Sequence, residues 1–209
     1  MYYSATIFYY AGFPTPTLTS LVVAVTNFLF TLVALTLIDR VGRRRILLWS
    51  IPVMVAGLLI VAIHFRSIDP EPVSVSREDK PASRGAAIAI VVGIMVYVAG
   101  YATGLGNVPW MQSELFGDKV RAVGSSIATS TNWGANFIVG ATFLILMDAL
   151  TPTWTFVLYA FICTIGYVLI YRIFPEMTGL TLEGAAHLLE ADDWGVSGNP
   201  PVPEPEISD

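Results

Sequence analysis

The amino-acid sequence predicts an all-α membrane protein with several spanning helices, and two observations support this. Only 13% of its 209 residues are charged and 55% are hydrophobic, whereas about 25% of the residues in a typical soluble domain are charged. A bilayer core about 30 Å thick is crossed by roughly 20 apolar residues of helix. Long parts of the chain contain no Asp, Glu, Lys or Arg: residues 1–38, 46–65, 86–113, 122–147 and 149–171.

We expect five complete spanning helices within these stretches. The first apolar piece, residues 1–12, is too short to cross a bilayer, and we interpret it as the outer end of a helix whose beginning is missing. Together the segments predict a transmembrane helical bundle over residues 1–175. The five spans are residues 17–38, 46–65, 86–109, 122–147 and 152–174.

Charge predicts the orientation of this bundle and the character of its two longest polar segments. Residues 39–45 contain four arginines, and basic residues in short loops mark the cytoplasmic side. The loop over residues 66–84 is then external, and the C-terminus is cytoplasmic. We expect a cytoplasmic helix over residues 176–192, and a disordered acidic, proline-rich tail over residues 193–209.

The span beginning near residue 86 should break before it ends. Pro109 has no N–H group and its ring clashes with the preceding turn, while Gly104 and Gly106 offer little resistance to bending. Transporters place broken helices of this kind at their substrate sites, although a simple packing kink is the alternative. Three side chains near the break could contact a substrate: Asn107, Trp110 and Gln112.

The next span carries two asparagines, Asn132 and Asn136, which lie four residues apart and share one helix face. Each amide both donates and accepts hydrogen bonds, so the pair suits a ligand dense in hydroxyl groups, such as a sugar or polyol. Alternatively, the asparagines join helices by hydrogen bonds. Tyr2 and Tyr3 lie deeper than an interfacial aromatic belt, where they would gate or line a site.

Small residues in two spans are interpreted as packing sites, because they let helices approach closely in lipid. They are Gly93, Gly100, Gly104, Gly106, Gly124, Ser125, Gly134 and Gly140.

Several charges near the predicted cytoplasmic edge suggest an interhelical network that holds one state of a two-state carrier. Simple anchoring of helix ends is the alternative. The members are Asp39, Arg43, Arg44, Glu114, Arg121 and Glu176.

An enzyme is the least favoured class for this chain. With two histidines and one cysteine, the sequence has no metal-ligand cluster, and it has neither a glycine-rich phosphate loop nor a nucleophile beside a base. We expect no cofactor, no metal and no nucleic-acid partner.

Five ordered motifs resemble the sugar porter family of the major facilitator superfamily. Met177 and Thr178 depart from the last motif, where the family has Thr-Lys, and so remove a charge. The motifs are Tyr2-Tyr3-Ser4, Asp39-Arg40-Val41-Gly42-Arg43-Arg44, Pro109-Trp110 with Glu114-Leu115-Phe116 and Arg121, Asn132-Trp133 with Asn136, and Pro175-Glu176 through Glu183.

The resemblance implies the C-terminal six-helix half of such a transporter, equivalent to helices seven to twelve, with the first helix truncated and the N-terminal half missing. It implies substrate contact for Trp110, Asn132, Tyr2 and Tyr3, and a cytoplasmic network for the charged residues above. Residues 106–110, Gly-Asn-Val-Pro-Trp, are similar to fungal myo-inositol transporters, whereas many hexose carriers have Gly-Pro-x-Pro-Trp there.

We therefore expect transport of myo-inositol by alternating access, with proton symport, in a full-length parent protein of the plasma membrane. Two alternatives stay open. One is a hexose or pentose transporter of the same family, and the other is a truncated fragment that does not transport.

Overall fold

The computed structural model describes residues 3–10, 16–68, 84–108, 116 and 120–174. All regular structure in these residues is helical, as the composition predicted. The predicted cytoplasmic helix and acidic tail lie outside them. The elements are α1 (Ser4–Tyr10), α2 (Pro16–Val41), α3 (Arg43–Ile68), α4 (Arg84–Thr103), the 3-10 helix η1 (Leu105–Asn107) and α6 (Arg121–Ile173).

The 53 residues of α6 form two segments that meet at a sharp turn. A straight helix of that length would extend about 80 Å, far more than a bilayer core. Thr151, just before Pro152, has φ 68° and ψ 155°, which reverses the chain. The Thr155 hydroxyl donates to the carbonyls of Leu146 and Thr151, both at 2.9 Å, and so satisfies backbone groups at the turn.

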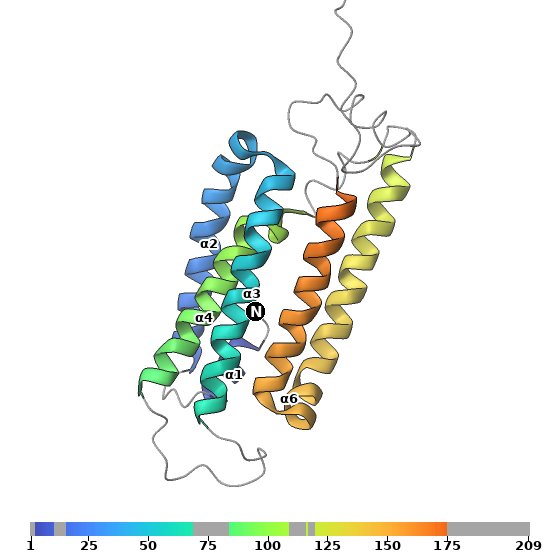
Figure 1. Ribbon diagram of the computed structural model, residues 1–209. Helices are drawn as coiled ribbons and strands as arrows, with labels where there is room; N and C mark the ends of the chain where they lie inside the picture. Colours follow the sequence, from blue (N-terminus) through green and yellow to red (C-terminus); the bar gives the residue numbers. More distant parts are fainter. Residues whose placement is uncertain (1–2, 11–15, 69–83, 109–115, 117–119, 175–209) are drawn as a thin grey trace, which may run out of the picture.

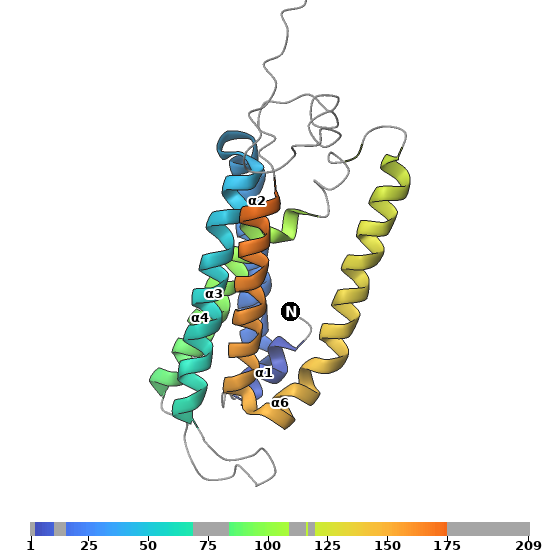
Figure 2. The same cartoon turned by 45° about the vertical axis from the view of Figure 1, so that its right-hand side comes forward.

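The two segments of α6 run back from this turn and diverge with distance from it (Figure 2). The sequence predicted separate spans over residues 122–147 and 152–174. The structure confirms them as the segments 121–150 and 152–173.

Helices α2, α3 and α4 pack together, and the second segment of α6 lies beside α3 (Figure 1). The core between them is apolar and draws on several helices. Phe8 of α1 and Ile90 of α4 are fully buried in it. Phe65 of α3 stacks on Phe156 of α6 with 5.6 Å between ring centroids.

Glycines bring α3 and α4 into close backbone contact. A Cβ atom at Gly57 would lie 2.6 Å from the Tyr97 backbone nitrogen and 2.7 Å from the Gly93 carbonyl oxygen. A Cβ at Gly93 would lie 2.8 Å from the Val61 side chain and 3.0 Å from the Gly57 carbonyl oxygen. Since real Cβ atoms do not approach so closely, only glycine fits both positions, and the predicted packing role of Gly93 is confirmed.

Large apolar side chains cover the outside of the helices, as expected of a surface that faces lipid. Trp49 is 78% exposed and Phe137 is 76% exposed. Within the described residues, α2, α3, α4 and α6 are long and apolar enough to cross a membrane. Because α6 consists of two helical segments, a helix lies at each of the five predicted spans, although α4 ends at Thr103, before the predicted end at residue 109.

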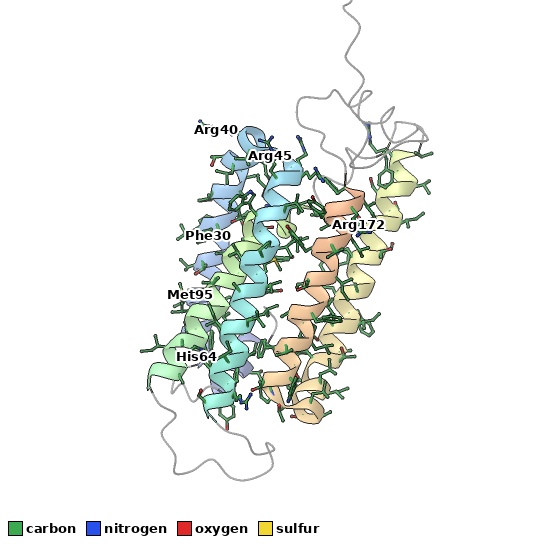
Figure 3. All side chains as sticks on the ribbon, in the orientation of Figure 1. Phe30, Arg40, Arg45, His64, Met95 and Arg172 are labelled. Atoms are coloured by element: carbon green, nitrogen blue, oxygen red, sulfur yellow. The ribbon has the colours of Figure 1, made fainter. Side chains whose placement is uncertain are left out.

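Arginines of α2, α3 and α6 lie at one end of the bundle (Figure 3), whereas Arg66 lies in the last turn of α3. Figure 3 shows Arg40 and Arg45 near the junction of α2 and α3, with Arg172 toward the same end of α6. His64 lies toward the opposite end. The predicted clustering of arginines at one edge is therefore confirmed.

Candidate functional site

The predicted break in the helix after residue 86 is present, and the chain leaves α-helical geometry at Gly104. The φ and ψ angles of Gly104 are −117° and −86°, and the next three residues form η1. Pro109, which the sequence suggested as the cause, lies outside the described residues. A Cβ at Gly104 would collide with the Ser50 side chain of α3. The helix break therefore packs closely against α3, and a residue with a Cβ atom does not fit at position 104.

Asn107 stabilises this break through its own side chain. It is 6% exposed, and its Nδ2 atom donates to the carbonyl oxygens of Ala102 at 2.9 Å and Thr103 at 3.3 Å. Carbonyls at the end of a helix lack intrahelical donors, and a buried unpaired carbonyl in lipid is costly. The amide nitrogen of Asn107 thus caps α4. Its contact with a substrate stays a prediction.

Asn132 and Asn136 lie on the first segment of α6 and are both exposed. Every residue from 129 to 139 is exposed, which is about three turns of this helix. A Cβ at Gly134 or Gly140 would meet nothing within 4 Å. The packing role predicted for most of the small residues is therefore not seen at the Cα positions of these two glycines within the described residues.

Tyr3 joins α1 to the same segment of α6. Its hydroxyl donates to the Gly140 carbonyl oxygen at 2.7 Å, and its ring stacks on Phe143 with 5.2 Å between centroids. Gly140 follows Asn136 by one helical turn, about 6 Å along the axis. The structure thus brings Tyr3 close to one end of the Asn132–Asn136 face.

Two basic members of the predicted charge network, Arg44 and Arg121, donate hydrogen bonds to backbone oxygens. The Nη2 atom of Arg44 donates to the Tyr171 carbonyl oxygen at 3.0 Å, and its guanidinium lies 5.8 Å from the centroid of the Tyr171 ring. The Nε atom of Arg121 donates to the Phe116 carbonyl oxygen at 3.2 Å. Arg43 is half-buried at the start of α3.

Arg44 therefore ties the beginning of α3 to the last turn of α6. One general signal could have indicated a contact of this kind, because the final carbonyls of any helix need outside donors. It could not identify Tyr171 as the partner, since 127 residues separate the two.

Several predicted residues fall outside what the structure describes, and their roles stay predictions: Tyr2, Trp110, Gln112, Glu114, Glu176 and the side chain of Asp39. Among the described residues, no three His, Cys, Asp or Glu side chains form a group that could hold a metal ion.

Comparison with known proteins identifies the family of this bundle. The sequence profile of the sugar (and other) transporter family matches residues 1–189. The chain belongs to this family. It is 46% identical over 190 residues to myo-inositol transporter 1 of Cryptococcus neoformans, covering 91% of this chain and 34% of that protein.

Other curated members of the family give the same pattern of coverage. Myo-inositol transporter 2 of Schizosaccharomyces pombe is 42% identical and covers 92% of this chain and 34% of its own length. Myo-inositol transporter 1 of Saccharomyces cerevisiae is 42% identical, and the match covers 91% of this chain and 33% of that protein. The chain thus spans about a third of the length of the curated relatives it matches.

Solved structures support the same fold for this member of the transporter family. The major facilitator superfamily proton:xylose symporter bound to 6-bromo-6-deoxy-D-glucose superposes with a TM-score of 0.74 at 24% identity, covering 90% of this chain and 38% of that one. A D-xylose–proton symporter superposes with a TM-score of 0.70 at 23% identity, covering 86% of this chain and 39% of that one. The predicted sugar porter family and all-α transporter fold are therefore confirmed, and the chain is a multi-pass membrane protein.

Proposed function

We propose that this chain is the C-terminal half of a myo-inositol transporter, corresponding to helices seven to twelve with a partial first helix. The whole transporter works by alternating access with proton symport in the plasma membrane. The observation that carries the proposal is the uncovered amide face of Asn132 and Asn136, which ends beside Tyr3. The names of the similar fungal proteins support inositol as the substrate.

An amide face of this kind matches the chemistry of inositol, whose ring carries a hydroxyl on every carbon. Each amide donates to and accepts from neighbouring hydroxyls, and an indole such as that of Trp110 packs against the C–H face of the ring. If each amide contact contributes about 1 kcal/mol net, four contacts give a dissociation constant of roughly 1 mM. Weak binding suits a carrier, because the substrate must be released on the far side.

The proposed orientation puts the arginine-rich end and the C-terminus in the cytoplasm, in keeping with the positive-inside rule. The link between Arg44 and Tyr171 joins α3 to α6 at this end. In the proposed cycle, Arg43, Arg44 and Arg121 pair with the acids Asp39, Glu114 and Glu176 in one of the two states.

Uptake of radiolabelled myo-inositol by the longer protein that contains this chain tests the site. Asn132→Ala removes one amide contact and should raise the half-saturating concentration about fivefold, with surface expression unchanged. Thr131→Ala is the matched control, because the Thr131 hydroxyl already donates to the Ile127 carbonyl of its own helix. Unchanged uptake in both Asn132→Ala and Trp110→Ala would refute the assignment.

A hexose or pentose carrier is the second candidate, favoured by the superposition on the xylose symporter structure. Competition separates the two. Excess glucose or xylose should leave inositol uptake intact in an inositol transporter and should suppress it in a sugar carrier of broader range.

The 209-residue chain by itself should not transport, because the amide face of α6 would be left against lipid with nothing across a cleft from it. Reconstituted vesicles containing this chain alone should take up no more inositol than empty vesicles. Saturable uptake by these vesicles would contradict the requirement for a second half.

A further inference from the structure

A second surface, away from the asparagines, is hollowed between α3 and the second segment of α6. The groove has a volume of about 490 Å³. Trp49 forms an exposed wall, whereas the smaller side chains of Pro52 and Ala56 leave the hollow. None of its lining side chains carries a charge. They are Leu48, Trp49, Pro52, Val53, Ala56 and Tyr167.

Positive charge stands at one mouth of this groove. Arg45 is exposed and precedes Leu48 and Trp49 by three and four residues, so it lies on the same face of α3 as the groove. Side chains of a helix lean toward its N-terminus, which carries the Arg45 guanidinium beyond the apolar lining. Figure 3 shows Arg45 at the arginine-rich end of the bundle.

Two aromatic rings of α6 lie on the other side of the groove from Arg45. The rings of Tyr167 and Tyr171 stack with 6.4 Å between centroids, and Arg44 lies over Tyr171 while bonding its carbonyl. Of the acidic side chains that the structure describes, Asp148 lies near the turn at Thr151, at the other end of α6. The described part of the mouth is therefore cationic.

We propose that this groove binds an anionic phospholipid, with one acyl chain along the groove and the phosphate beside Arg45. The dimensions favour a lipid, because from Arg45 to Ala56 the helix rises about 16 Å, close to half of a bilayer core about 30 Å thick. The groove thus follows one leaflet from headgroup depth to the midplane. A basic group at that depth attracts anionic lipid by about 1 kcal/mol, which is roughly fivefold enrichment.

Trp49 provides the measurement, because its exposed indole lines the groove. The 209-residue chain is reconstituted in phosphatidylcholine vesicles with a minor fraction of brominated lipid, either phosphatidylserine or phosphatidylcholine with the same chains. The difference between the native chain and Trp49→Phe isolates quenching at Trp49. We expect brominated phosphatidylserine to reach half-maximal quenching at an about fivefold lower fraction than brominated phosphatidylcholine.

Arg45→Gln should abolish this preference, and Arg45→Lys, which keeps the charge, should retain it. Arg40→Gln is the matched control, since Arg40 is exposed at the same end of the bundle but belongs to α2. Ala56→Phe fills the groove and should reduce quenching by both lipids.

Three results would overturn the proposal. Equal quenching by the two lipids would show that the groove has no headgroup preference. An equal loss in Arg40→Gln and Arg45→Gln would show only a diffuse surface potential. Protection of Trp49 from both lipids in a crosslinked dimer would show that a second copy of the chain covers the groove. The inositol-uptake experiments are independent of all three.

Discussion

The α3–α4 pair and the first segment of α6 are both rich in small residues, yet they use them in opposite ways. At Gly57 and Gly93 a Cβ would collide with the backbone of the facing helix, whereas at Gly134 and Gly140 it would meet nothing within 4 Å. Each residue from 129 to 139 is exposed. One region is a tightly packed support, and the other is a helix whose neighbours along this stretch are not among the described residues.

The contrast separates a region held by close helix packing from a region that leaves polar side chains exposed. Close helix packing in lipid depends on small residues and van der Waals contact, and the α3–α4 pair supplies it. The first segment of α6 instead keeps Asn132 and Asn136 uncovered. Beyond residues 129–139, on the C-terminal side, the segment is joined to α1 through Tyr3 and then reaches the turn at Thr151.

The largest expected effect on the free energy of unfolding compares a glycine of the α3–α4 contact with a glycine of the first segment of α6. Gly57→Ala should destabilise the fold by about 3 kcal/mol, because the added methyl group meets backbone atoms that cannot move aside. Gly134→Ala is the matched control and should be neutral or stabilise by up to about 1 kcal/mol, since alanine favours helix over glycine. Unfolding of the chain in mixed micelles, followed by helical circular dichroism, gives both values. Equal effects would break the comparison.

A second, smaller effect compares two asparagines. Asn107→Ala should cost about 2 kcal/mol, because the Ala102 and Thr103 carbonyls lose the donor that caps them inside the protein. Asn132→Ala should change stability by less than about 0.5 kcal/mol, because its side chain is exposed. The same unfolding assay measures both. A large loss in Asn132→Ala would mean that this residue supports the fold rather than a substrate.

The spans were predictable from sequence because bilayer thickness fixes their length and charged residues interrupt the apolar runs. The reversal in α6 was expected between residues 147 and 152, and Pro152 explains it. The break in α4 was also expected, among Gly104, Gly106 and Pro109, and it begins at Gly104. The contact of Gly104 with Ser50 of another helix was not predictable from the sequence.

The direction of individual side chains was harder to predict, because local sequence does not determine it. The predicted substrate contact of Asn107 stays a prediction, and the sequence did not indicate that its amide nitrogen caps α4. Arg44 was expected in a network of acids, and within the described residues it contacts Tyr171. In both cases the side chain donates to a backbone carbonyl that lacks a donor within its own helix. Tertiary packing, rather than spacing along the chain, decides which carbonyl lies within reach.

The smallest expected effect concerns the attachment of α1 to the open segment of α6. Tyr3→Phe removes the hydroxyl that donates to Gly140 but keeps the ring stacked on Phe143, so it should cost about 1 kcal/mol. Tyr3→Ala removes both contacts and should cost more, because a stacked aromatic pair adds about 0.5–1.5 kcal/mol. Hydrogen exchange of the amides around Gly140 should speed up in the same order. If Tyr3→Phe exchanged as fast as Tyr3→Ala, the hydroxyl rather than the ring would hold α1, and the open segment would be tethered at this end by one hydrogen bond.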